Sequence, residues 1–413
     1  MKPRQKSLHP GSGSVGWILV LSIVGYPLVA GLVEILSTNS RVLTVPFRAL
    51  VAAASLWAIL SFVSKKSRFK VSIFWMSWVA FWVLYLSRLA IDVRLYSNSI
   101  QLPEWEYWLY AAGVSLMPAV AAGIRTRHTS GISTSRCMIL FSAVAILFNL
   151  AVLISNYGLE LSYSSNFLRA ETESLNPIAL GHLGVTCAIL SVWTVITDRR
   201  AFRSHTIFYL ITLSVGLLGI AMSGSRGPVL SLAIVLSLML WHSSLFIKLL
   251  SILLICLGSI FLAFNPSLLD SYLIERVTTH MWEDSVRANL LSEAFQLIEK
   301  YPISGNGIDP LPVYPHNIIV EAFMVGGVPM GALLCVMLTI SMWKAVTLNS
   351  LSHSFGWVSL IFVQYMIAAM VSGSIYIVSP MWVAMAAMMT LSTGGGKTGA
   401  ASQTARSSRH PIP

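Results

Sequence analysis

Residues 15–36 of the chain, VGWILVLSIVGYPLVAGLVEIL, contain a single charged side chain, Glu34. A helix of about 20 apolar residues is long enough to cross the hydrocarbon core of a bilayer, so this stretch predicts a membrane span. Similar apolar stretches recur along the chain and predict twelve spans in all. They are residues 15–36, 42–63, 71–91, 108–124, 137–157, 177–197, 206–222, 228–245, 249–264, 316–343, 355–372 and 380–391. We therefore predict an all-α, polytopic integral membrane protein with about twelve transmembrane helices.

The composition supports this class. Of the 413 residues, 55% are hydrophobic and 10% are charged, whereas soluble domains carry about 25% charged residues. The basic residues before residue 15 resemble the start of a signal peptide, but the apolar stretch is too long and lacks a small-x-small cleavage site. We expect residues 15–36 to be retained as the first span. Residues 1–393 are then one transmembrane domain.

The basic residues predict the orientation of the chain. The net charge is +11, and the Lys and Arg residues fall in patches at every second connection between spans. If these connections and both termini are cytoplasmic, 18 of the 27 Lys and Arg residues lie inside, as the positive-inside rule requires. Membrane orientation therefore explains the charge better than nucleic-acid binding. The Gly-, Ser- and Thr-rich residues 394–413 predict a disordered cytoplasmic tail.

One outer connection, residues 265–315, is much longer than the others and predicts a large loop outside the membrane. Within it, Asp284 or Ser285 can cap an amphipathic helix that ends at Lys300, before Tyr301-Pro302. The helical period puts five apolar residues on one face: Leu290, Leu291, Ala294, Phe295 and Ile298. Ser304-Gly-Asn-Gly307 then predicts a tight turn.

Ionisable residues within the spans are functional candidates because burying a charge in lipid is costly. Under the predicted topology, Arg88, Asp92 and Glu321 lie in the outer halves of their helices and the midplane carries almost no charge. An ion-coupled transporter places such groups near the midplane. The pattern instead favours a basic cavity that opens outward and admits a lipid phosphate, although anchoring of the helix end explains Arg88 equally well.

Two arginines are candidates for phosphate binding. Arg226, in Met222-Ser-Gly-Ser-Arg-Gly-Pro228, lies at a predicted helix N-terminus, where a cation is unfavourable unless it shares an anion with the helix. Arg287 lies on the apolar face of the loop helix, so it points into the protein if that face packs inward. In both cases a contact with lipid headgroups is the simpler alternative.

Pro315-His316-Asn317 opens the tenth predicted span, and Glu321 follows one turn later. A helix N-terminus disfavours the cationic form of histidine, so His316 is expected to be a neutral base near pH 7, oriented with help from Asn317 and Glu321. A structural role is the common alternative for a single interfacial histidine. Arg169 gives a weaker signal, as does the Asn-Pro pair that begins the sixth span.

The order and spacing of these motifs resemble the bacterial O-antigen ligase and O-antigen polymerase superfamily. The resemblance covers residues 169–331 and includes Ser223-Gly-Ser-Arg-Gly-Pro, Arg287, Tyr301-Pro302 with Gly305-x-Gly307, and His316-Asn317 with Gly326-Gly-x-Pro329. Pro228 stands where the family commonly has a smaller residue. The outer loop is also somewhat short for the family.

The resemblance implies a metal-independent glycosyltransferase of type C, without a cofactor, in the inner membrane of a bacterium. Its donor would be a glycan linked to undecaprenyl diphosphate. Its acceptor would be lipid A core or another glycan repeat at the periplasmic face, for a ligase or a polymerase respectively. Arg226 and Arg287 would contact the diphosphate, Arg169 would line the donor site, and His316 would serve the acceptor hydroxyl. A lipid or polysaccharide transporter remains the alternative.

Overall fold

The computed structural model of the chain describes residues 13–63, 72–95, 101–125, 131–157, 175–245, 248–249, 281–348, 350–351 and 353–391. Within these ranges the chain is almost entirely helical and contains no β-strand, which confirms the predicted all-α class. The predicted tail, residues 394–413, lies outside the described residues, and so does Arg169.

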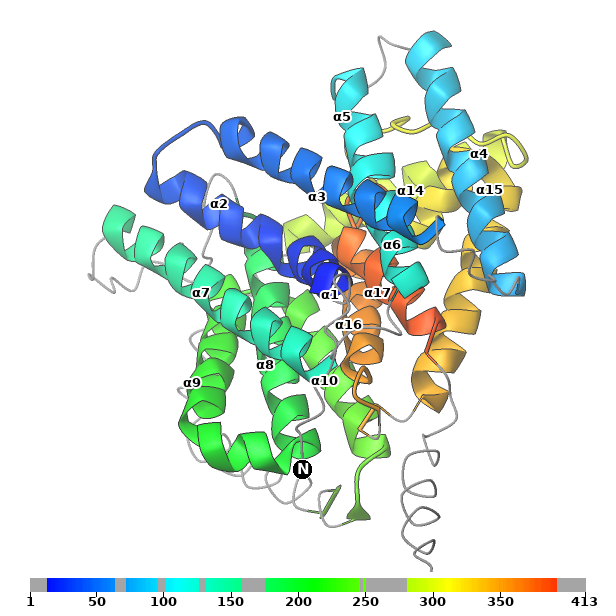
Figure 1. Ribbon diagram of the computed structural model, residues 1–413. Coiled ribbons are helices and arrows are strands. Elements are labelled where there is room, and N and C mark those ends of the chain that lie inside the picture. Colours follow the sequence, from blue (N-terminus) through cyan, green and yellow to red (C-terminus); the bar gives the residue numbers. More distant parts are fainter. Residues whose placement is uncertain are drawn as a thin grey trace, which may run out of the picture.

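The first apolar stretch forms α1 (Gly13–Val20), the π-helical segment η1 (Leu21–Gly25) and α2 (Tyr26–Ile35), which continue one another. The remaining elements are α3 (Ser40–Val63), α4 (Ile73–Leu95), α5 (Glu104–Trp108), η2 (Leu109–Leu116), α6 (Met117–Arg125), α7 (Gly131–Tyr157), α8 (Pro177–Thr197), α9 (Arg199–Ser223), α10 (Arg226–Trp241), α14 (Met281–Lys300), α15 (Ile318–Thr347), α16 (Trp357–Ser372) and α17 (Ser379–Met389) (Figure 1).

Eleven of the twelve predicted spans coincide with helices in the described part of the chain. Eight helical segments there are long and apolar enough to cross a membrane, and three more, α10, α16 and α17, are apolar but shorter. The predicted ninth span, residues 249–264, lies outside the described residues apart from its first residue. The total of twelve spans therefore stays a prediction.

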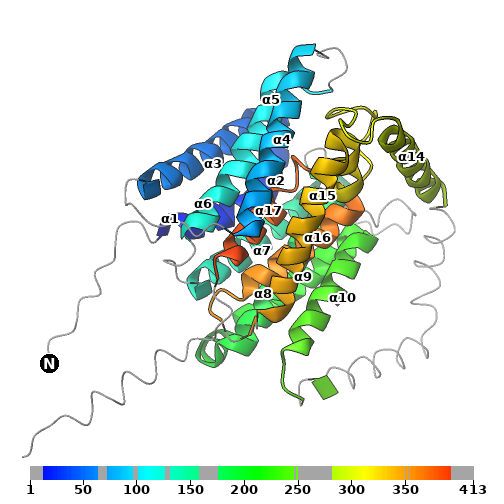
Figure 2. The same cartoon turned by 90° about the vertical axis from the view of Figure 1, so that its right-hand side faces the viewer.

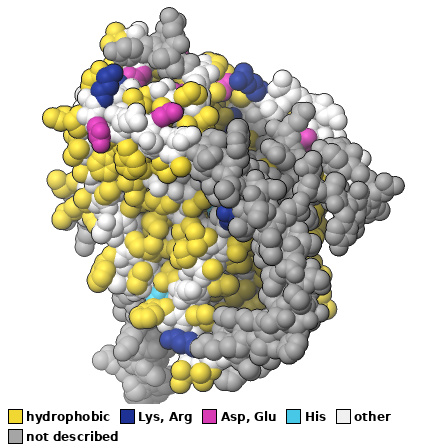
Figure 3. Space-filling view, turned by 180° about the vertical axis from the view of Figure 1, so that it is seen from behind, with side chains coloured by type: hydrophobic (Ala, Val, Ile, Leu, Met, Phe, Trp, Pro, Cys, Tyr) yellow, Lys and Arg dark blue, Asp and Glu magenta, His cyan; other side chains and the backbone are white. Residues whose placement is uncertain are grey.

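The surface of the bundle is that of a membrane protein. Large apolar side chains such as Trp57, Ile73 and Ile207 are at least 70% exposed, far more than a soluble protein tolerates over a continuous surface. Hydrophobic side chains cover the middle of the face shown in Figure 3, and acidic side chains gather at one end of it. Lipid tails are the solvent that suits such a band.

Helix α8 forms the centre of the bundle and packs against α7, α9, α10 and α16. Small residues let α8 and α9 approach closely, because a β-carbon added to Gly216 would lie only 2.8 Å from the Gly184 carbonyl oxygen. Close backbone approach at glycine is the usual way in which helices pack in lipid, where the hydrophobic effect gives little attraction between them.

A break in α15 holds the connection that follows α14. Gly327 has a φ of 69° and interrupts the helix, so its backbone groups need partners outside it. The connection supplies them: the Asn306 amide donates to the Met324 carbonyl (2.8 Å), and the Val328 amide donates to the Pro302 carbonyl (2.7 Å). A β-carbon on Gly327 would lie 2.4 Å from the Ile303 oxygen, so glycine is required at this position.

Helix α14 lies where a helix is predicted but begins at Met281, three residues before Asp284 and four before Ser285, the two predicted caps. The position of this segment outside the membrane stays a prediction. Its predicted apolar face is partly wrong. Ala294 is fully buried and packs with Leu311 and Met324, whereas Phe295 is 54% exposed. Successive residues of a helix differ by about 100°, so Phe295 turns away once Ala294 faces α15. Figure 2 shows α14 beside the beginning of α15, at the same end of the molecule as the end of α4 and the beginning of α5.

Candidate functional site

His316 lies directly before α15 rather than in its first turn. The helix begins at Ile318, and Asn317 is its N-cap, so the prediction that His316 opens the helix is wrong by two residues. The His316 backbone has a φ of 55°, in the left-handed region that few side chains adopt. Its ring centroid lies 4.6 Å from that of Tyr314. The ring atom Nδ1 is buried and has no hydrogen-bond partner among the described residues.

The electrostatics of His316 agree with the expectation of a neutral base, but for a different reason. Burial lowers the pKa of His316 from its usual value, and the positive charge of Arg287 lowers it further. Desolvation disfavours the imidazolium, and so does a nearby cation. The dipole of a helix N-terminus, the cause expected from the sequence, is not needed to explain the shift.

Arg287 lies in the buried stripe of α14. It is three residues before the half-buried Leu290 and seven before Ala294, so all three side chains project from the same side of the helix. Because Ala294 packs on α15, this side of α14 faces the protein interior. Arg287 is then close enough for its positive charge to lower the pKa of His316.

Asn317 and Glu321 position the start of α15. The Asn317 side-chain oxygen accepts hydrogen bonds from the Ile319 and Val320 amides (3.0 and 3.1 Å), and its Nδ2 donates to the Met370 carbonyl (3.3 Å). Glu321 is buried and accepts from the Ser374 hydroxyl and the Ile375 amide (2.7 and 3.0 Å). These bonds hold the α16–α17 connection, and a role of Glu321 in orienting a sugar or the His316 ring stays a prediction.

Arg226 is the first residue of α10 and is exposed. The helix begins two residues before Pro228, which was expected to be its first residue. A β-carbon added to the adjacent Gly227 would lie 3.6 Å from the Val371 side chain. Because Asn317 bonds to Met370, the beginnings of α10 and α15 meet at the C-terminal end of α16. The structure thus brings Arg226, His316 and Arg287 to the same end of the bundle.

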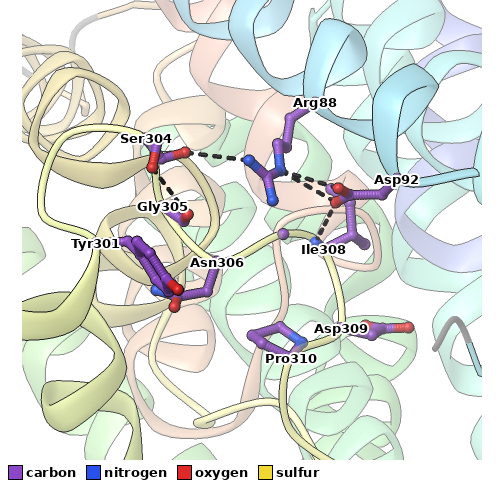
Figure 4. Close-up of a pocket in the computed structure, with 10 residues that line it drawn as sticks. Arg88, Asp92, Tyr301, Ser304, Gly305, Asn306, Ile308, Asp309 and Pro310 are labelled. Atoms are coloured by element: carbon purple, nitrogen blue, oxygen red, sulfur yellow. Dashed lines mark hydrogen bonds and ion pairs between the residues drawn. The ribbon is translucent and has the colours of Figure 1, made fainter. Parts of the chain in front are cut away.

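Arg88 lies at a different place on the same side of the bundle. Its guanidinium forms an ion pair with Asp92 (3.0 Å) and donates to the Ser304 carbonyl (3.3 Å). The Asp92 carboxylate also accepts from the Ile308 amide (2.8 Å). These contacts join α4 to the connection between α14 and α15, and they border a pocket of about 480 Å³ (Figure 4).

A pair of tyrosines lies between that pocket and Glu321 in the first turn of α15. The Tyr107 hydroxyl donates to Asp309, which lines the pocket. The Tyr107 and Tyr376 rings lie 5.6 Å apart. Burial raises the pKa of Tyr376, and the negative charges of Asp309 and Glu321 raise it further, as they do only over short distances. Asp309, Tyr376 and Glu321 are therefore close together, between the pocket and the beginning of α15.

Two features of this region escaped the sequence analysis. His182 is 4% exposed, and neither of its ring nitrogens has a hydrogen-bond partner in the described part of the chain. It faces the beginning of α10, since a β-carbon at Gly227 would lie 3.9 Å from its Nε2. A single ionisable residue in an otherwise apolar span was the available signal. The sequence around Asp309 and Tyr301 does not mark them as site residues. They line a pocket only because the connection between α14 and α15 folds against α4.

Within the described ranges, His, Cys, Asp and Glu residues do not gather in groups of three that could hold a metal ion. Comparison with known protein families found no matching family. No curated protein matches the sequence either.

Proposed function

We propose that the chain is a membrane glycosyltransferase. It transfers a glycan from undecaprenyl diphosphate to a sugar hydroxyl at the outer face of a bacterial inner membrane. The observation that carries the proposal is His316, whose buried Nδ1 has no hydrogen-bond partner among the described residues and lies within the electrostatic reach of Arg287. A base that is kept neutral next to a fixed cation suits a reaction in which a hydroxyl attacks and a phosphate leaves.

The proposed reaction is a single displacement. The acceptor hydroxyl oxygen bonds to the anomeric carbon and gives its proton to His316, while the bond from that carbon to the diphosphate oxygen breaks. The electron pair leaves with the undecaprenyl diphosphate, and the configuration at the anomeric carbon inverts. Arg287 and Arg226 stabilise the growing negative charge, with Arg169 as a further donor-site residue. The reaction uses no metal ion or cofactor.

Purified protein in nanodiscs tests the proposal. Wild-type protein is expected to release undecaprenyl diphosphate from a lipid-linked glycan only when lipid A core or a second lipid-linked repeat is present. His316→Asn should lower the rate about 10² to 10⁴-fold, the usual contribution of a general base. Asparagine tolerates the left-handed backbone of residue 316, so the variant should keep its fold.

His242→Asn is the matched control, because His242 lies at the opposite end of α10 from Arg226. Unchanged turnover in His316→Asn would remove the histidine from the mechanism. If the wild-type protein released no carrier with either acceptor but moved the lipid-linked glycan across a vesicle membrane, the chain would be a transporter. In a deletion strain, a single repeat on the core indicates a lost polymerase, and a core without antigen indicates a lost ligase.

A further inference from the structure

The pocket next to Arg88 is separate from the residues assigned to the reaction. Two structural elements form it: α4 and the connection from α14 to α15. The lining residues are Arg88, Asp92, Tyr301, Ser304, Gly305, Asn306, Gly307, Ile308, Asp309 and Pro310. Figure 4 shows them around an open centre, with Arg88 and Asp92 across from Tyr301 and Asn306. Its volume of about 480 Å³ lies within the range of small-molecule sites, about 300–1,000 Å³.

The charges in the pocket do not suit a free anion or a cation. Arg88 and Asp92 neutralise one another at 3.0 Å. The third ionisable side chain of the lining, Asp309, accepts a hydrogen bond from the Tyr107 hydroxyl, and burial raises its pKa and so disfavours its charged form. The Arg88 Nε and Nη1 atoms are engaged with Asp92 and Ser304, whereas Nη2 makes no hydrogen bond to another described residue. Guanidinium carries five N–H donors, so the pair still offers donors to a neutral ligand. Such a ligand must be rich in hydroxyl groups to use donors and acceptors that stand side by side.

Glycine keeps the floor of the pocket open. Gly307 has a φ of 101°, and a β-carbon there would lie 2.8 Å from an Asp92 carboxylate oxygen and 3.2 Å from Arg88 Nη2. Any side chain at this position would cover the ion pair. The backbone of residues 304–308 is instead held against it by the Arg88–Ser304 and Asp92–Ile308 hydrogen bonds.

Tyr301 adds an aromatic surface. It lines the pocket and is 47% exposed, although it directly follows α14. An amphipathic ring of this kind presents an apolar face and a polar edge. A sugar has the complementary character, with C–H groups on a ring face and hydroxyl groups at its rim.

We infer that this pocket binds a sugar unit of the acceptor glycan, away from the reacting hydroxyl. The inference rests on the proposed glycosyltransferase function and adds a second subsite to it. His316 follows Pro310 by six positions, and six residues of chain span at most about 20 Å. The pocket and the proposed base are therefore only a few sugar units apart, so one oligosaccharide can occupy both.

Direct binding tests the inference without turnover. The probe is the lipid-free oligosaccharide released by mild acid from the host's own surface glycolipid, which removes any partition into the bilayer. Isothermal titration calorimetry on the full chain in nanodiscs should show saturable binding to the wild-type protein. Tyr301→Ala should weaken the Kd at least about tenfold, as loss of a central aromatic contact does.

Ile303→Ala is the matched control. Ile303 lies in the same connection, is 76% exposed and does not line the pocket, so its Kd should equal that of the wild-type protein. In turnover assays Tyr301→Ala should raise the KM for the acceptor and leave the KM for the donor unchanged.

Two results would overturn the inference: no binding of the probe to the wild-type protein, or an equal loss of binding in Tyr301→Ala and Ile303→Ala. The proposed function fails independently of the pocket. If binding depends on Tyr301 but no acceptor releases undecaprenyl diphosphate, the pocket is a glycan site on a protein that is not a transferase.

Discussion

At the scale of single residues, the environment of His316 decides the chemistry of the candidate site. The side chain is half-buried, and a fixed cation acts on it from another helix. Burial and the Arg287 charge both lower the pKa of His316. A base must be neutral to accept a proton, so a lowered pKa extends activity towards acid.

Removal of the Arg287 charge should shift the pH profile. In Arg287→Gln the pKa of His316 rises towards its usual value, so more of the histidine is protonated at a given acidic pH. The acid limb of kcat/KM against pH should therefore move to higher pH. Measurement of kcat/KM between about pH 5 and 8, the range in which histidine titrates, detects the shift.

Lys300→Gln is the control for this experiment, because Lys300 is an exposed cation at the far end of the same helix. It should leave the acid limb in place. An Arg287→Gln profile that coincides with the wild-type profile would mean that the two side chains do not interact. A uniform fall in rate at all pH values would then be the only effect of the substitution.

At the scale of elements, α14 and α15 form the frame of the site. The Gly326–Gly327 break in α15 receives the backbone of the preceding connection, and Ala294 of α14 packs against the same helix through Met324. Arg287, His316 and the pocket thus depend on one helix pair. A substitution that disturbs the packing of α14 on α15 should therefore displace Arg287, His316 and the pocket together.

Two neighbouring residues of α14 offer a paired test. Ala294 is fully buried and Phe295 is 54% exposed. Ala294→Gln should displace α14, because the added side chain is larger and introduces a polar group without a partner. Transfer activity should fall at least about tenfold, the loss expected from a displacement of 1 Å or more in an active site. Phe295→Gln should retain most of the activity.

Protein level and thermal stability, measured by fluorescence-detected size exclusion, separate a local effect from unfolding. A local displacement of α14 leaves the melting temperature of Ala294→Gln close to that of Phe295→Gln. Equal activity in the two variants would contradict the packing of α14 on α15.

At the scale of the whole molecule, the distribution of charge sets the expected orientation. Both termini and the segment around Ser204, at the beginning of α9, are predicted to be cytoplasmic, and Ser304 is predicted to face outward. Ser304 is exposed in the structure, so a cysteine there is accessible from the solvent on its side of the membrane.

Labelling with an impermeant thiol reagent tests the orientation. In intact spheroplasts a Ser304→Cys variant should react, and a Ser204→Cys variant should react only after permeabilisation. The unsubstituted chain reports the reactivity of the native cysteines. The reverse pattern of labelling would invert the topology and put the candidate site in the cytoplasm.

The sequence alone was sufficient to locate most of the helices in the described part of the chain. Eleven predicted spans coincide with described helices. The length of an apolar stretch can be read from the local sequence, and such a stretch must be helical in lipid because every backbone N–H and C=O group needs a hydrogen-bond partner there. The loop helix and the turn at Gly305 and Gly307 followed from equally local signals, capping and glycine conformation.

Only the tertiary structure decided which of these residues meet. Arg287 lies near His316 because α14 packs on α15 through Ala294 and Met324, and Glu321 bonds to Ser374 because α16 ends beside it. The pocket requires Arg88 and Tyr301, which are separated by more than half of the chain. Side-chain periodicity specifies a face of one helix but not its partner, since the partner depends on how all the helices fill space together.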